Sequence, residues 1–273
     1  MKTLNNHTLL YDEDCPVCNL YTSGFIKAKM LDNQGRKPFI AITNEEENYI
    51  DLERAKNEIA LVDNKNKKVF YGMDSLLKVI GNSFPWMERV GNWKPINYIL
   101  KKLYKFISYN RKVIAPNKNT NKTSIQCIPS FNVKYRIFYI ILATLFTTVV
   151  LYKYAKLITL LPEASFSREI LLATGQIVFQ YVFIQKINKQ EQLNYIGNLV
   201  TVSVMGSLLL LPILLLNQFI IINKFIILAW FGITVSLMIL EHNRRTNILN
   251  LPKYLTITWI LYRLLALIII LIF

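Results

Sequence analysis

Five long apolar runs fill the second half of this 273-residue chain, and they constrain the fold more than any other feature. They cover about 136–155, 168–187, 195–217, 224–241 and 254–273. A helix needs about 20 mostly apolar residues to cross the hydrocarbon core of a bilayer. The pattern therefore predicts an all-α transmembrane domain with about five spans.

The first half has the composition of a soluble domain. Residues 1–136 hold 22 Lys and Arg and 13 Asp and Glu, against 10 and 4 in residues 137–273. This length is enough for one hydrophobic core. The net charge of +15 could indicate nucleic acid binding, but beside membrane spans it favours attraction to anionic lipid. No nucleic acid partner is therefore expected.

The apolar spacing of the first half predicts the order strand, helix, strand, helix, strand, strand, helix. The expected strands cover 8–12, 38–42, 58–63 and 68–71, and the helices cover 15–31, a segment capped by Thr43 or Asn44, and 74–80, capped by Asp74. This order fits a thioredoxin-like α/β domain. The expected division is 1–115 for that domain, 116–135 for a basic polar linker and 136–273 for the transmembrane helical domain.

Two cysteines, Cys15 and Cys18, follow the first expected strand as Cys-Pro-Val-Cys. Thiols at this spacing can close a disulfide across one helical turn, which permits two-electron redox exchange. Unpaired N–H groups and the positive end of a helix stabilise a thiolate at its start, so Cys15 is the expected nucleophile. Cys18, one turn deeper, is expected to resolve the mixed disulfide.

Three carboxylates stand next to the cysteine pair. Negative charge from Asp12, Glu13 and Asp14 raises a nearby thiol pKa and predicts a poise toward the reducing side. Asp12, at the end of the strand, could relay a proton to Cys18. For Glu13 and Asp14 a solvated acidic turn is the preferred interpretation.

Residues 11–18, which read Tyr-Asp-Glu-Asp-Cys-Pro-Val-Cys, resemble the start of the DCC family of thiol-disulfide oxidoreductase-like proteins. That family continues with a strand-turn-strand ending near a Gly, matched by 60–72, and with a Tyr-rich helix and an Asn-Arg pair, matched by 104–111. The resemblance covers roughly the first 115 residues. It implies a thioredoxin-like fold and thiol redox activity.

The sequence departs from these patterns in two places. Glu13 stands where the family usually has Gly, in the turn before the thiols. No proline precedes the strand expected from Glu58, so the cis-proline that lines the thioredoxin substrate groove is missing. The resemblance therefore does not imply peptide binding in the thioredoxin manner.

No metal or other cofactor is expected. A zinc site needs four ligands, and beside the pair the chain offers only Cys127, His7 and His242, none at ligand spacing. An iron–sulfur cluster lacks cysteines, and a buried, inert pair is an alternative to a redox site. Cys127 is expected to be a free thiol. The apolar runs contain no cysteine, so a thiol relay across the membrane is not expected.

Residues 99–123 carry seven Lys and Arg, no acid, and interleaved apolar side chains. A basic amphipathic helix beside a membrane predicts docking on anionic lipid headgroups. The alternative is a solvated helix whose apolar face covers the domain core, and both can hold at once.

The distribution of cations predicts a cytoplasmic N-terminal domain, in a protein expected in a bacterial cytoplasmic membrane. His242 is expected in an inner basic loop, near headgroups. Lys153 and Lys156 disagree with this topology, so an alternative has four spans with that segment interfacial. The expected inner loops hold Lys186, Lys189, Arg244, Arg245 and Lys253.

Few polar residues fall inside the apolar runs. Arg263 lies near the middle of the last one, where a charge is costly and is expected to be functional or paired with Glu169 or Glu241. Gln176 and Gln180 share one face of the second run and are expected to bond a neighbouring helix.

Two functions compete on these grounds. The first is a membrane-anchored thiol-disulfide oxidoreductase that acts on an unknown protein or small-molecule thiol or disulfide at the cytoplasmic face. The second is a non-catalytic membrane protein, for assembly or transport, whose front is a structural binding module. A quinone- or lipid-modifying enzyme has only Arg263 and the number of spans in its favour.

Overall fold

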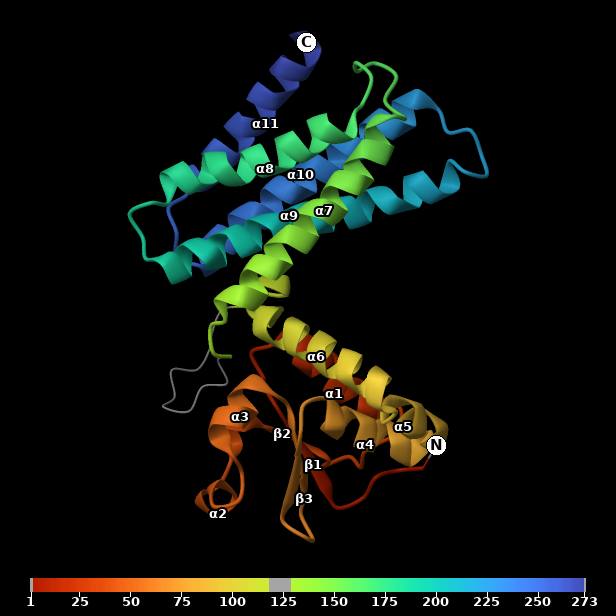
Figure 1. The fold of residues 1–273 in the computed structure, drawn as a ribbon, viewed down its shortest axis with the longest axis vertical. Helices are drawn as coiled ribbons and strands as arrows, with labels where there is room; N and C mark the ends of the chain where they lie inside the picture. The colour runs from red at the N-terminus through yellow and green to blue at the C-terminus, as the bar shows by residue number, and fades with distance from the viewer. Residues whose placement is uncertain (1, 118–128, 273) are drawn as a thin grey trace. The chain divides into compact units, whose positions relative to one another are not determined.

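The computed structural model describes residues 2–117 and 129–272 (Figure 1). The chain divides into two compact units, Met1–Asn132 and Val133–Phe273. Cys127 and the end of the basic segment, 118–123, lie outside the described residues.

A four-stranded mixed sheet forms the centre of the first unit. Its strands are β1 (His7–Tyr11), β2 (Arg36–Pro38), β3 (Ala60–Asp63) and β4 (Lys68–Tyr71). They lie in the order β2-β1-β3-β4, with β1 and β2 parallel and the other two pairs antiparallel. A strand-helix-strand unit followed by a hairpin and a helix is the α/β fold that the sequence predicts.

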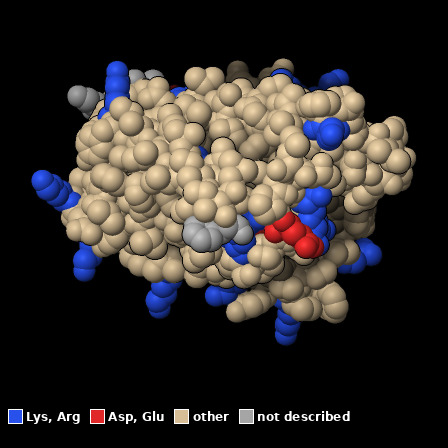
Figure 2. All heavy atoms as spheres, turned by 90° about the horizontal axis from the view of Figure 1, so that it is seen from above, with Lys and Arg blue, Asp and Glu red and all other residues tan. Residues whose placement is uncertain are grey.

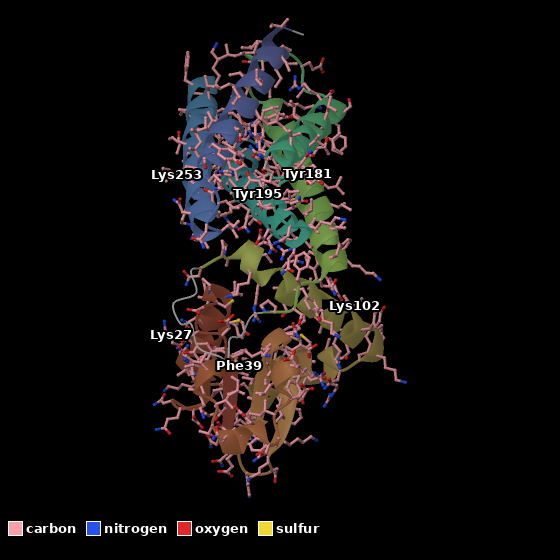
Figure 3. The ribbon with its side chains drawn as sticks, turned by 90° about the vertical axis from the view of Figure 1, so that its left-hand side faces the viewer. Lys27, Phe39, Lys102, Tyr181, Tyr195 and Lys253 are labelled. Carbon is pink, nitrogen blue, oxygen red and sulfur yellow. The ribbon has the colours of Figure 1, made fainter. Side chains whose placement is uncertain are left out.

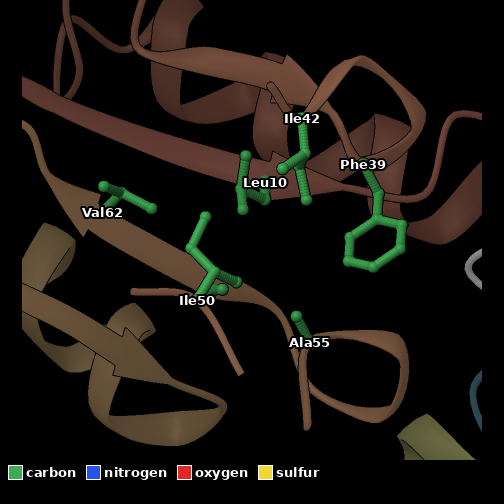
Figure 4. Packing of buried hydrophobic residues seen from close by; sticks show 7 residues of the cluster. Leu10, Phe39, Ile42, Ile50, Ala55 and Val62 are labelled. Carbon is green, nitrogen blue, oxygen red and sulfur yellow. The ribbon is translucent and has the colours of Figure 1, made fainter. Parts of the chain in front are cut away.

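Helices cover both faces of this sheet (Figure 1). Because side chains alternate along a strand, neighbouring residues of β1 serve two different cores. Leu10 packs with Val62 and Ile50 on one face (Figure 4), and Leu9 packs with Leu61 on the other. The helices are α1 (Pro16–Lys27), α2 (Asn44–Glu47), α3 (Leu52–Asn57), α4 (Met73–Ser83), α5 (Pro85–Gly91) and α6 (Lys94–Ile114).

Two expected elements are shorter than their apolar patterns. The strand over 38–42 is wrong, because β2 ends at Pro38, which has no N–H for further pairing, and Phe39–Ala41 form a 3₁₀ turn, η1. That turn buries Phe39 in the core. The first helix ends at Lys27 rather than residue 31, since Lys29 adopts a left-handed conformation with φ of 55°.

Gly72, not Asp74, caps the start of α4. Its φ of 59° and ψ of −127° suit glycine alone, and a Cβ there would lie 2.8 Å from Glu58 Oε2. Asp74 lies in the first turn instead, where a carboxylate favours the positive helix end.

Five helices build the second unit at the expected positions. They are α7 (Val133–Ala155), α8 (Phe166–Phe183), α9 (Lys189–Leu216), α10 (Lys224–Ile248) and α11 (Tyr254–Ile272). Four of these described helices, α7, α9, α10 and α11, are long and apolar enough to cross a membrane. The face seen from above in Figure 2 is mostly uncharged. These features are those of an integral membrane protein.

The number of candidate spans is thus four rather than five. The helix left out is α8, which has 18 residues and carries Arg168, Glu169, Gln176 and Gln180. Helix α7, the segment that the four-span alternative placed at the interface, is one of these four apolar helices.

His242 does not lie in a headgroup loop as expected. Helix α10 continues past it to Ile248, and its side chain is 1% exposed. Its ring nitrogens hydrogen-bond with Tyr195 Oη at 3.2 Å and Thr256 Oγ1 at 3.0 Å. Figure 3 shows Tyr195 among the helices of this unit. The histidine therefore links three helices of the bundle.

Candidate active site

The start of α1 brings the two cysteines together. Cys15 is the residue that caps the helix, with an extended backbone, and its sulfur accepts a hydrogen bond from the Cys18 N–H at 3.5 Å. Pro16 occupies the first turn, where its missing N–H costs nothing. Both cysteines are free thiols.

Both thiols are buried. Cys15 is 1% exposed and Cys18 is 6% exposed, and they pack against Tyr11, Val17 and Tyr21. A substrate disulfide can therefore reach the sulfur of Cys15 only after neighbouring groups move.

The two thiols differ in acidity. Hydrogen bonds from the side chain and backbone of Cys18 lower the pKa of Cys15 to about 6, with help from the charge of Arg111 and against the effect of burial. The same side-chain hydrogen bond, together with burial, raises the pKa of Cys18. The pair thus favours a thiolate on Cys15 and a thiol on Cys18.

Contrary to the sequence-based expectation, the acidic turn does not dominate the electrostatics of the site. Asp12 is buried, and its Oδ2 lies 3.3 Å from a guanidinium nitrogen of Arg111 and 3.7 Å from Lys112 Nζ. Its Oδ1 accepts the N–H of Asp14 at 3.1 Å. These cations offset the negative charge that Asp12 places near the thiols. The expected rise in the pKa of Cys15, and the reducing poise built on it, are therefore not supported.

Arg111 is the site residue that the sequence did not reveal. It lies near the end of α6, is 6% exposed, and also donates to the Lys56 carbonyl at 3.1 Å. Its effect on the pKa values of both thiols gives it a second role besides pairing Asp12. The available signal was the Asn-Arg pair that closes the family pattern.

Aromatic side chains complete the surroundings of the thiols. Burial raises the pKa of Tyr21, as does a hydrogen bond with Cys18. The Tyr11 hydroxyl accepts a hydrogen bond from Arg36 at 3.2 Å, and that guanidinium lies 4.6 Å from the Tyr11 ring centroid. Tyr21 is therefore a protonated phenol beside the two thiols, and the Arg36 guanidinium holds the side chain of Tyr11.

Helix α6 has two different faces. Its buried side carries Ser108 and Arg111, whereas the other side exposes large apolar residues and lysines such as Lys102 (Figure 3). Within the described part of 99–123, the helix thus packs one side on the domain, and docking of the other side on lipid headgroups stays a prediction. The exposed apolar residues include Tyr98, Ile99, Leu103 and Ile107.

No group of three His, Cys, Asp or Glu side chains that could hold a metal ion is found in residues 2–117 and 129–272.

Residues 9–115 match the family model of DCC1-like thiol-disulfide oxidoreductase. This match confirms the resemblance drawn from residues 11–18, 60–72 and 104–111, and it covers less than half of the chain. The front of the chain is therefore similar to that class of redox proteins, while the helical second unit matches no family model. No curated protein and no solved structure matches the chain.

Proposed function

We propose that the chain is a membrane-anchored thiol-disulfide oxidoreductase that works from the cytoplasmic face. The observation that carries this proposal is the acidic Cys15 thiol at the start of α1, paired with a protonated Cys18 thiol. The family match of residues 9–115 supports it. Residues 1–115 supply the chemistry, and 136–273 hold the protein in the membrane.

The reaction follows from the two acidities. The Cys15 thiolate attacks one sulfur of a substrate disulfide, which forms a mixed disulfide and releases the other substrate sulfur as a thiolate. Cys18 then loses its proton and attacks the sulfur of Cys15, which releases the second substrate thiolate. The substrate gains two electrons, the pair becomes a disulfide, and an external thiol donor reduces it again.

Asp12 is proposed to help the second step. Cys18 has a raised pKa, so its attack requires a group that takes its proton. The charge of the Asp12 carboxylate raises the pKa of both thiols, and this effect supports the proposal. Arg111 and Lys112 hold this carboxylate in place.

The test uses the full-length protein in detergent, insulin as the disulfide probe and dithiothreitol as the donor. Cys15→Ser and Cys18→Ser should each lose turnover by a factor of 10³ or more, since neither sulfur alone completes the exchange. Cys127→Ser is the matched control and should keep the wild-type rate. Equal rates in all four proteins would instead support the non-catalytic membrane protein.

The exposed side of α6 is proposed to dock on anionic lipid headgroups. Lysines beside exposed aromatic and aliphatic side chains are the composition of a membrane-surface helix. In nanodiscs, amide hydrogen exchange across 94–114 should slow when anionic lipid replaces zwitterionic lipid, and it should slow less after Lys101, Lys102 and Lys105 are changed to Gln. The cytoplasmic placement is tested separately by protease access to the first unit in sealed vesicles.

A further inference from the structure

A cavity of about 270 Å³ lies inside the second unit, and all five of its helices line it. Its wall is mostly apolar, from residues such as Leu151, Leu199 and Leu267. The volume falls just below the usual range for small-molecule pockets, about 300–1,000 Å³. It suits a single ring or one acyl chain better than a two-chain phospholipid.

Several polar groups in this wall have no protein partner. Both amide atoms of Gln176 are buried without a hydrogen bond to any described residue, and so are the hydroxyls of Thr147 and Ser207 and the indole nitrogen of Trp259. These four side chains are at most 3% exposed. Buried polar groups are nearly always hydrogen-bonded in folded proteins, so four unsatisfied side chains in one wall indicate a ligand.

A comparison with a neighbouring glutamine on the same helix indicates that the missing hydrogen bonds of Gln176 are specific to the cavity wall. Gln180 lies one turn after Gln176 on α8 and is equally buried. Its Oε1 accepts a hydrogen bond from Tyr195 at 2.8 Å, and its amide nitrogen donates to the Leu255 carbonyl at 3.4 Å. Neighbouring helices thus supply hydrogen-bond partners to Gln180, whereas Gln176 lines the cavity without one among the described residues.

Arg263 adds a positive charge to the same wall, in the middle of α11. The expected carboxylates do not neutralise it: Glu169 pairs with Arg168 at 2.7 Å, and Glu241 pairs with two other arginines. Its guanidinium lies 4.9 Å from the Trp259 ring centroid, and its Nε is buried without a hydrogen bond in the described parts of the chain. Since Arg168 and Glu169 cancel, the lining carries a net charge of +1.

We propose that this cavity binds a single-chain amphiphile with a carboxylate head, the chemical class of fatty acids. The guanidinium of Arg263 and the N–H and O–H donors around it suit an anionic acceptor, and the apolar wall suits the chain. A cationic amphiphile would repel Arg263, and a neutral one would leave its charge unpaired. This site is independent of the thiol chemistry proposed for the first unit.

The probe is 11-bromoundecanoate, whose bromine quenches nearby tryptophan, with 11-bromoundecanol as its neutral counterpart. Full-length protein in zwitterionic nanodiscs is titrated with each, and Trp259→Phe identifies the part of the signal that comes from the cavity. Wild-type protein should bind the carboxylate tenfold or more tightly than the alcohol. Arg263→Gln should remove this preference, Arg263→Lys should retain part of it, and Arg244→Gln, an exposed arginine outside the cavity, should change nothing.

A second variant shows whether the probe enters the cavity. Ser207→Leu fills part of the space with an apolar side chain and should weaken binding of both probes tenfold or more, with the thermal midpoint of the free protein retained. Equal affinity of the wild type for the two probes would overturn the carboxylate assignment. Wild-type binding by Ser207→Leu, or an unchanged preference in a folded Arg263→Gln protein, would overturn the site itself.

Discussion

Each unit holds an arginine among its packed side chains, and the two arginines have different surroundings. In the first unit Arg111 meets the carboxylate of Asp12 at 3.3 Å, next to the thiols. In the second unit Arg263 lies over a tryptophan ring, and among the residues that the structure describes no carboxylate forms an ion pair with it. A paired buried charge is held by its partner, whereas an unpaired one in a membrane segment is costly and marks function. In the first unit a protein carboxylate balances the charge of Arg111. In the second unit the proposed ligand would balance the charge of Arg263.

The largest expected effect is a difference in stability between variants of these two arginines. Arg111→Met should destabilise the first unit by about 3 kcal/mol, because it removes the nearer of the two cations that pair with the buried carboxylate of Asp12. Arg263→Met should leave the stability of the second unit unchanged or raise it, since it removes a part-buried charge that has no ion pair among the described residues. Hydrogen exchange of β3 amides reports the first change, and thermal unfolding of the full chain in detergent reports the second.

Asp12→Asn is the matched control for the first of these variants. It removes the negative partner, keeps the shape of the side chain, and should destabilise the first unit as Arg111→Met does. A strong loss of stability in Arg263→Met would mean that the second arginine is a structural group, and the contrast between the units would fail.

A smaller effect should appear in the reactivity of the thiols. With a pKa of about 6, Cys15 is mostly a thiolate at pH 7 and mostly protonated at pH 5. The rate of its alkylation by iodoacetamide should therefore rise about tenfold from pH 5 to pH 7 and then level off. The rate for a free cysteine, with a pKa of about 8.5, would continue to rise steeply above pH 7. Mass spectrometry of the labelled peptide separates Cys15 from Cys18.

The same measurement in Arg111→Lys tests the electrostatic part of this shift. Lysine keeps the charge but not the planar fork, so the midpoint should remain well below that of a free thiol. A midpoint near 8.5 in the wild-type protein would show that the first helical turn does not activate Cys15.

The sequence predicts what depends on local patterns. Alternation and apolar runs identified β1, β3, β4 and the five helices of the second unit, and the Cys-Pro-Val-Cys spacing identified Cys15 and Cys18. The pairing of Asp12 with Arg111 depends on α6 folding back against the end of β1, which no local pattern reveals. The apolar pattern also ended α10 too early, at Glu241. The polar residues that follow are helical, and there Arg245 donates hydrogen bonds to Asn198 at 2.9 Å and to Glu241 at 2.7 Å.

The smallest effect compares Gln176 and Gln180, one turn apart on α8. Gln180→Leu should destabilise the second unit by about 1–2 kcal/mol, because the Tyr195 hydroxyl and the Leu255 carbonyl lose a partner. Gln176→Leu removes a side chain with no partner among the described residues, so the ligand-free protein should unfold at the same temperature or higher. The two variants have the same size and chemistry, and thermal unfolding in detergent compares them directly. Equal destabilisation by both would show that Gln176 has a structural partner, and the cavity would then lose its best evidence for a ligand.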